Sequence, residues 1–236
     1  MKVNIIGILK QRKAQATEYY VKGQADIAKT NTATLVFSGI GLLFITILLY
    51  LVSFIMFSGW RPRWTHNGLL IIGLASIFIG LLLQKKKVTS FYLVLFCSLL
   101  FQYGVMFMII SMGTFVYWDC PSTFITLVLI VLPVMFIIPE TIMLPSVIIW
   151  ATTFVVLTYQ TKIVSAIEFD VFSSIAAAIG SIILLVITSQ LRVKEYLSKR
   201  EYMELSVVDV LTGVWNKAAC AQKADEYLKN RGKEPF

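Results

Sequence analysis

Residues 171–191 read VFSSIAAAIGSIILLVITSQL, a stretch without a single charged side chain. A helix needs about 20 predominantly apolar residues to cross the hydrocarbon core of a bilayer. Hydrocarbon offers the backbone no hydrogen-bonding partner, so a single segment that crosses it must be helical. This stretch therefore predicts a transmembrane helix.

Five further charge-free runs resemble it in length and apolar character. They are residues 30–60, 64–84, 88–118, 120–139 and 141–161. Of the 236 residues, 58% are hydrophobic and 14% are charged, whereas a soluble domain carries about 25% charged residues. The sequence therefore predicts an all-α membrane protein with a bundle of six transmembrane helices, the sensor domain, in residues 31–190.

Prolines interrupt the fourth and fifth of these runs. Membrane helices tolerate proline where neighbouring groups bond the carbonyls that it leaves free. We expect Pro139 and Glu140 to form the tip of a tight hairpin between two spans. A re-entrant pair of helices is the alternative.

The positions of lysine and arginine predict the orientation. All but three of the 21 basic residues lie in residues 1–30, in the KKK loop at residues 85–87, or after residue 191. Only Arg61, Arg63 and Lys162 fall on the other side. Basic residues collect in cytoplasmic loops, so both termini are expected in the cytoplasm. This distribution explains the net charge of +8, and no nucleic-acid partner is expected.

The cytoplasmic N-terminal segment, residues 1–30, is basic. Its KQRK follows the short apolar NIIGIL instead of preceding it, which is not the pattern of a secretory signal peptide. We expect a partly amphipathic segment on the anionic membrane surface. A disordered basic tail is the alternative.

The spans offer few chemical groups for transport or metal binding. No ionisable residue lies near the middle of a run, which disfavours a pump or carrier. The one histidine, His66, and the cysteines Cys97, Cys120 and Cys220 fall in different environments. They predict neither a metal site nor a disulfide.

The outer loop SMGTFVYWDCPSTF, residues 111–124, is the most distinctive stretch on the far side. Its Tyr117, Trp118 and Asp119 are candidate contacts for a small ligand entering between helices. The alternative, which we favour, is an aromatic belt at the membrane interface.

The last span continues without glycine or proline into a predicted cytoplasmic signalling helix, residues 191–208. Residues at alternating steps of three and four form a heptad seam with a polar interruption: Val193, Tyr196, Arg200, Met203 and Val207. Two heptads are short, and chance patterning is the alternative. With the small residues SSIAAAIGS of the last span, which suit close helix packing, the seam predicts a homodimer.

A turn signal, DVLTGVWNK, follows at residues 209–217. Asp209 can end the helix by bonding backbone amides two or three residues further on, and Gly213 is free to take a positive φ. Beyond it an amphipathic helix is expected, with Ala218, Ala221, Ala224 and Leu228 on one face. The chain supplies nothing to cover that face.

This stretch resembles the opening motif of GGDEF domains, the catalytic domains of bacterial diguanylate cyclases. The matching residues are Asp209, Leu211, Thr212, Gly213 and Asn216, and Lys217 stands where the family has arginine. The resemblance covers residues 195–236 and makes residues 209–236 the start of an incomplete α/β domain. We therefore expect the front part of a longer protein.

The resemblance implies that the complete parent protein joins two GTP molecules into cyclic di-GMP with Mg or Mn, in the bacterial cytoplasmic membrane. The family's metal-binding and catalytic residues come later than residue 236, so no catalysis is expected of this chain. The expected partners are the bilayer, a second copy and an unknown small-molecule or membrane stimulus. Alternatives are a receptor whose degenerate GGDEF domain only binds nucleotide, and a transport or structural membrane protein.

Overall fold

The structure is a computed structural model that describes residues 5–56, 62–86 and 90–207, together with residues 215, 220, 221, 224 and 227. All the elements in these residues are helices, which confirms the all-α class. The chain divides into two compact units, residues 1–190 and 191–236.

The helices follow one another with short connections. Their bounds are α1 Ile5–Lys22, α2 Gln24–Met56, α3 Trp64–Lys85, α4 Phe91–Ser111, the π-helix η1 Met112–Val116, α5 Thr123–Met135, α6 Glu140–Thr161 and α7 Val164–Val207. Five segments of the described residues are long and apolar enough to cross a membrane: α2, α3, α4 with η1, α6 and α7. The remaining predicted run coincides with α5, which has 13 residues.

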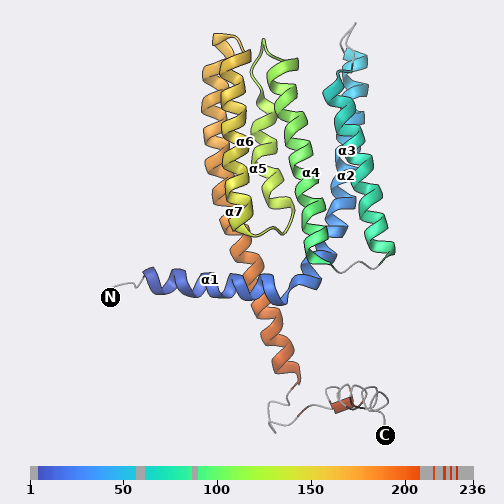
Figure 1. The fold of residues 1–236 in the computed structure, drawn as a ribbon, viewed down its shortest axis with the longest axis vertical. Coiled ribbons are helices and arrows are strands. Elements are labelled where there is room, and N and C mark those ends of the chain that lie inside the picture. Colours follow the sequence, from blue (N-terminus) through green and yellow to red (C-terminus); the bar gives the residue numbers. More distant parts are fainter. Residues whose placement is uncertain are drawn as a thin grey trace. The chain divides into compact units, whose positions relative to one another are not determined.

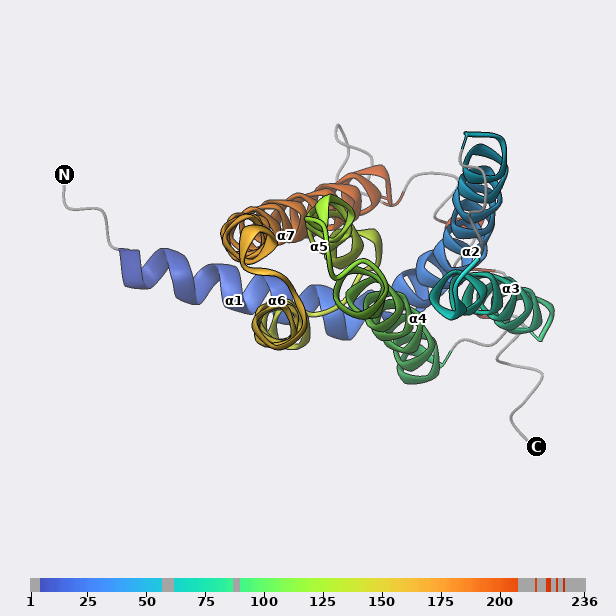
Figure 2. The ribbon, with the colours of Figure 1, turned by 90° about the horizontal axis from the view of Figure 1, so that it is seen from above.

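Large apolar side chains point outward from the long helices. Examples, one from each, are Phe37, Phe78, Phe107, Ile148 and Phe172. An apolar surface of this extent is unfavourable in water and suits contact with lipid. In the first unit α4 lies between the α2–α3 pair and the α5–α6 pair (Figure 2). The structure thus has the outward-facing apolar surface of a membrane protein.

Helices α2 and α3 approach closely through small residues. A Cβ atom at Gly39 would lie 2.2 Å from the Ser76 hydroxyl and 2.8 Å from the carbonyl oxygen of Gly73. Only glycine fits at such a distance, because a side chain would overlap the backbone of the neighbouring helix.

Helix α5 ends early because its backbone changes direction after Met135. Pro133 has no N–H to donate, and Phe136 is extended, with φ −103° and ψ 156°. The residues up to Pro139, which caps α6, form no regular structure. The prolines therefore mark a real connection between two apolar segments.

Helix α5 is shorter than its neighbour α6. Before α5, the Ser122 hydroxyl accepts a hydrogen bond from the Lys162 ammonium, and after it residues 136–139 lead directly to Glu140 of α6. The 22 residues of α6 rise about 33 Å. The 13 residues of α5 rise about 20 Å, and residues 136–139 can add at most about 13 Å.

Side chains of the first two helices hold the extended segment. The Asn31 side-chain amide donates to the carbonyl of Ile137 at 2.9 Å, and the Ile137 N–H donates to the Asn31 carbonyl oxygen at 2.8 Å. The Tyr20 hydroxyl donates to the carbonyl of Ile138 at 3.1 Å. Helix α1, which carries Tyr20, runs across this end of the bundle (Figure 1). Backbone groups that a helix would have paired are paired here by side chains.

The carbonyl of Leu132 receives a similar partner. In a continuous helix it would accept from residue 136, but Phe136 is extended. The buried amide of Gln102 in α4 donates to it instead, at 2.8 Å. Three helices thus support the interruption after α5.

Candidate functional site

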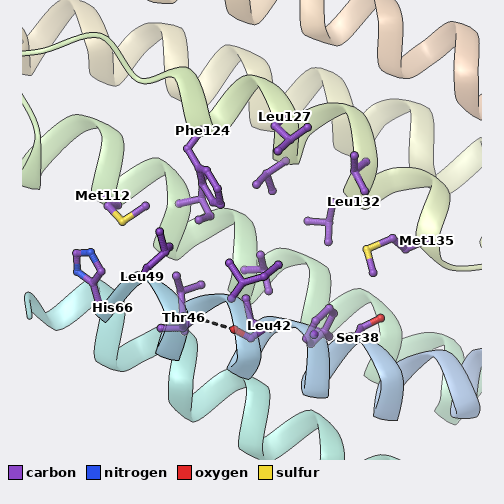
Figure 3. A pocket seen from close by; sticks show the side chains of 18 of the residues that line it. Ser38, Leu42, Thr46, Leu49, His66, Met112, Phe124, Leu127, Leu132 and Met135 are labelled. Atoms are coloured by element: carbon purple, nitrogen blue, oxygen red, sulfur yellow. Dashed lines mark hydrogen bonds between the residues drawn. The ribbon is translucent and has the colours of Figure 1, made fainter. Parts of the chain in front are cut away.

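An elongated cavity of about 540 Å³ lies between α2, α4 and α5. Figure 3 shows His66, Leu49 and Met112 at one end, and Ser38 and Met135 at the other. Leucine, isoleucine, valine, phenylalanine and methionine make up most of its wall. Ligand pockets in proteins commonly measure about 300–1,000 Å³, so the cavity has the size of a small-molecule site.

Four polar side chains interrupt this apolar wall: Thr34, Ser38, Thr46 and His66. The hydroxyls of Thr34 and Thr46 donate to carbonyls four residues earlier in α2. The Ser38 hydroxyl is buried and has no hydrogen-bond partner among the described residues. The lining contains no charged side chain. The wall therefore suits an uncharged, mainly apolar molecule.

His66 closes one end of the cavity within a group of aromatic rings. Its Nδ1 accepts a hydrogen bond from the Arg63 N–H at 3.4 Å. The imidazole centroid lies 6.0 Å from the ring of Tyr50 and 6.3 Å from that of Tyr117. Within the described residues, no three histidine, cysteine or acidic side chains gather in a way that could hold a metal ion.

A buried ion pair lies at the junction of α5, α6 and α7. Lys162 Nζ lies 2.5 Å from Asp170 Oδ2, and neither side chain is exposed. The ammonium also donates to the Cys120 carbonyl at 2.7 Å and to the Ser122 hydroxyl at 2.8 Å. Asp170 Oδ1 accepts from the Ser122 N–H at 2.8 Å. This cluster ties residues 120–122 to the junction of α6 and α7, some 40 residues later in the sequence.

Sequence reasoning missed this cluster. It assigned Lys162 to the outer side and noticed no partner for it. The available signal was that Lys162 and two acidic residues, Glu168 and Asp170, lie between two apolar runs. That pattern does not show burial, which depends on the distant backbone of residues 120–122.

The structure separates the three outer-loop candidates. Tyr117 is half-buried and lines a second cavity of about 190 Å³ beside Cys120 and Ser122. Trp118 and Asp119 are exposed, and the Trp118 carbonyl accepts from the Ile163 N–H at 3.4 Å. Only Tyr117 of the three lines a described cavity. Ligand contact by this loop stays a prediction.

The seam residues all belong to α7, which continues as a helix to Val207. Val193 is buried, Tyr196 and Arg200 are half-buried, and neighbouring Lys194 and Lys199 are exposed. This part of α7 therefore has one face with buried or half-buried side chains and another with exposed lysines. Pairing of the seam with a second copy stays a prediction.

The turn motif lies outside the described residues. This applies to Asp209, Leu211, Thr212, Gly213, Asn216 and Lys217. The described residues of the following stretch, Cys220, Ala221, Ala224 and Tyr227, are helical.

No family of known proteins, no curated protein and no solved structure matches the chain.

Proposed function

We propose that this chain is the membrane-embedded sensory and signal-transmitting part of a diguanylate cyclase-type protein. The observation that carries the proposal is α7, which runs without a break from Val164 to Val207. Its first part is apolar, its last part is rich in charged residues, and the DVLTGVWNK motif follows two residues later. A continuous helix is a direct mechanical link between a membrane bundle and a cytoplasmic domain.

Six crossings are the second part of the proposal. Helix α5 and residues 136–139 together can reach up to about 33 Å, and the hydrocarbon core of a bilayer is about 30 Å thick. Irregular backbone is tolerated at membrane depth only where protein groups surround and satisfy it. The amides of Asn31 and Gln102 supply such groups. These features support α5 as a crossing segment.

Both termini are proposed to lie in the cytoplasm of a bacterium, on the side of most basic residues. Helix α1 supports this placement because its Lys10, Arg12 and Lys13 are exposed, while its Tyr20 bonds the bundle. A helix held in this way can rest on anionic lipid head groups.

Signal transmission is proposed to occur between two copies through α7. A rotation or shift of the last span would reorient the seam and, through the turn motif, the two domains that must bring their GTP molecules together. A polar residue in a seam costs stability and keeps alternative packings close in energy. Arg200 occupies that position here. The metal ions and GTP belong to the domain that the motif opens.

The proposal is tested by changing the helical phase between the last span and the turn motif. Residues 1–217 are joined to the catalytic domain of an active diguanylate cyclase, and cyclic di-GMP is measured in cells. One alanine inserted after Lys194 rotates everything that follows by about 100°, whereas seven inserted residues restore the phase within about 20°. We expect the single insertion to change the cyclic di-GMP level several-fold and the seven-residue insertion to restore it. Equal cyclic di-GMP levels from the fusion without an insertion and from both insertion variants would contradict the proposal.

The buried ion pair favours a second candidate, a transporter, because buried ionisable residues in membranes often mark ion paths. Against it, each proton of the Lys162 ammonium already has an acceptor, and the large cavity carries no charged side chain. Solute uptake into vesicles that is lost in Asp170→Asn would favour transport.

A further inference from the structure

Helix α1 lies across one end of the membrane bundle. Figure 1 shows it running across the direction of α4 and α6, close to the start of α4, and Figure 2 shows its first half extending past α6. A helix that crosses the spans at their end lies along the membrane surface. The first half of α1 therefore lies beside the bundle, over lipid and not over protein.

The end of the bundle that α1 crosses has the residue pattern of the lipid head-group level. Helix α3 ends on this side with Lys85, and the next residue, Lys86, is also exposed. Helix α4 begins on this side, and the large side chains Tyr92 and Phe96 in its first two turns are exposed. Basic residues followed by exposed aromatic ones mark the passage from head groups to hydrocarbon.

The first half of α1 carries positive charge that nothing in the described chain balances. Lys10, Arg12 and Lys13 are exposed, and none of them has an acidic partner among the residues that the structure describes. Residues 1–17 contain no aspartate or glutamate. The charge is thus concentrated on the part of the helix that lies beside the bundle, where anions of the surroundings can balance it.

The second half of α1 is attached to the bundle by two tyrosines. Tyr19 is buried, and its ring centroid lies 5.1 Å from that of Tyr20. The Tyr20 hydroxyl donates to the carbonyl of Ile138. Only Gly23 separates α1 from α2, and its N–H donates to the carbonyl of Tyr19 at 2.8 Å. A force on the first half of α1 would therefore reach the connection between α5 and α6.

We propose that the first half of α1 is a binding surface for anionic lipid head groups, such as those of phosphatidylglycerol, and that Tyr20 couples this binding to the segment after α5. The phosphates of these lipids supply the negative charge opposite Lys10, Arg12 and Lys13. As a lipid surface α1 stands by itself; as the stimulus site of the sensor it rests on the proposed function. The test below uses the chain without a catalytic domain, so its failure is distinct from a failure of the helical-phase experiment.

The test measures hydrogen exchange in membranes of different charge. The full chain is placed in nanodiscs of phosphatidylcholine alone and of phosphatidylcholine with increasing phosphatidylglycerol, and exchange is followed by mass spectrometry. We expect exchange in the α1 peptide to slow several-fold as phosphatidylglycerol increases and to recover in high salt, because salt screens exposed charges. Exchange of the Ile137 amide, which donates to Asn31, should slow in parallel.

Paired charge variants assign the lipid effect to the first half of α1. Lys13→Gln should weaken the effect about two- to fivefold, because one basic residue near an anionic surface changes the affinity about fivefold. Lys22→Gln removes one charge from the same helix, but Lys22 pairs with Glu18 and belongs to the half that crosses the bundle. It should leave the lipid effect nearly unchanged.

Tyr20→Phe separates lipid binding from coupling. The substitution removes the hydroxyl that bonds the Ile138 carbonyl and keeps the ring. The α1 peptide should still respond to phosphatidylglycerol, whereas the peptide with the Ile137 amide should lose most of its response. Tyr92→Phe, which removes an exposed hydroxyl at the same end of the bundle, should change neither response.

Each part of the proposal has a result that would overturn it. Equal exchange of α1 in neutral and anionic nanodiscs would show that its charges bind no lipid head groups. Equal effects of Lys13→Gln and Lys22→Gln would show a response to net charge alone and not to a surface on the first half of α1. An Ile137 amide that fails to respond when α1 does, or that responds fully in Tyr20→Phe, would refute the coupling.

Discussion

The ammonium group of Lys162 carries three protons and has three acceptors: the carboxylate of Asp170, the carbonyl of Cys120 and the hydroxyl of Ser122. Burying a charged pair is expensive, and the expense is offset only when the remaining polar atoms also find partners. The Ser122 N–H, which bonds the second carboxylate oxygen, meets that requirement for Asp170. At the scale of single residues, the cluster determines how α5, α6 and α7 meet.

Lys162→Met is predicted to destabilise the protein by about 3–5 kcal/mol, because it leaves the Asp170 carboxylate buried without a counter-charge. The double variant Lys162→Met with Asp170→Leu should recover much of that loss, since no charge is left in the site. Thermal unfolding of the detergent-solubilised protein, followed by circular dichroism, measures both effects.

The control for this prediction is Lys22→Met. Lys22 pairs with Glu18 at 2.8 Å, but its side chain is 57% exposed. Exposed pairs contribute about 1 kcal/mol or less, so little change is expected. A Lys162→Met protein as stable as Lys22→Met would show that the buried pair does not hold the helices together.

The charge pattern of the sequence alone does not predict the buried pair of Lys162 and Asp170. The sequence shows that Lys162 and Asp170 end apolar runs, and from that we inferred only a side of the membrane. Their partners in residues 120–122 come from a loop some 40 residues away, and nothing in the local pattern indicates that contact. The Ser38 hydroxyl is hidden for a similar reason, because serine within a helix usually bonds its own backbone.

At the scale of elements, α5 differs most from its expected form. Residues 120–139 are apolar and long enough for a full span, so composition predicts one continuous helix. Pro133 and the extended Phe136 end the helix after Met135. The sequence did show the prolines, and from them a break. It could not show that Asn31, more than a hundred residues earlier, would bond the backbone of Ile137.

Asn31→Leu is predicted to disrupt the segment after α5. The substitution removes both partners of the Ile137 backbone groups, and each buried group left unpaired costs about 1–3 kcal/mol. Thermal unfolding should show the loss of stability, and hydrogen exchange should show faster exchange of the Ile137 amide. Helices α2 and α6 themselves should keep their protection.

The matched control is Asn67→Leu. Asn67 also uses its side-chain oxygen in a hydrogen bond, accepting from Tyr50, but the residue is exposed. Water can replace that bond, so a much smaller change is expected. Equal effects of the two substitutions would indicate that the bonds of Asn31 are no more important than a surface contact.

At the scale of the whole molecule, the all-α class and the five long apolar helices follow from charge-free runs that any reader of the sequence can find. Three further statements stay predictions that composition supports less directly than the helices themselves: the orientation, the sixth crossing and the role of α7 in signalling. The cavity between α2, α4 and α5 was not foreseen, because each of its lining residues reads locally as a lipid-facing or core side chain.

The native cysteines test the number of crossings. With six crossings, Cys120 lies outside the membrane and Cys220 inside, and both are exposed. In a Cys97→Ala background, a membrane-impermeant maleimide added to intact spheroplasts should therefore label Cys120. It should reach Cys220 only after the membrane is permeabilised. Variants that keep a single cysteine assign each signal by mass.

A bundle with five crossings predicts the opposite result for Cys220. If α5 and residues 136–139 returned to the side from which they entered, α6 and α7 would both reverse direction, and Cys220 would react from outside together with Cys120. That outcome would also separate the turn motif from cytoplasmic GTP, and the proposed signalling role would fail with it. Labelling of Cys120 alone would instead place an even number of crossings before Cys220, and it would therefore support α5 as the sixth crossing segment.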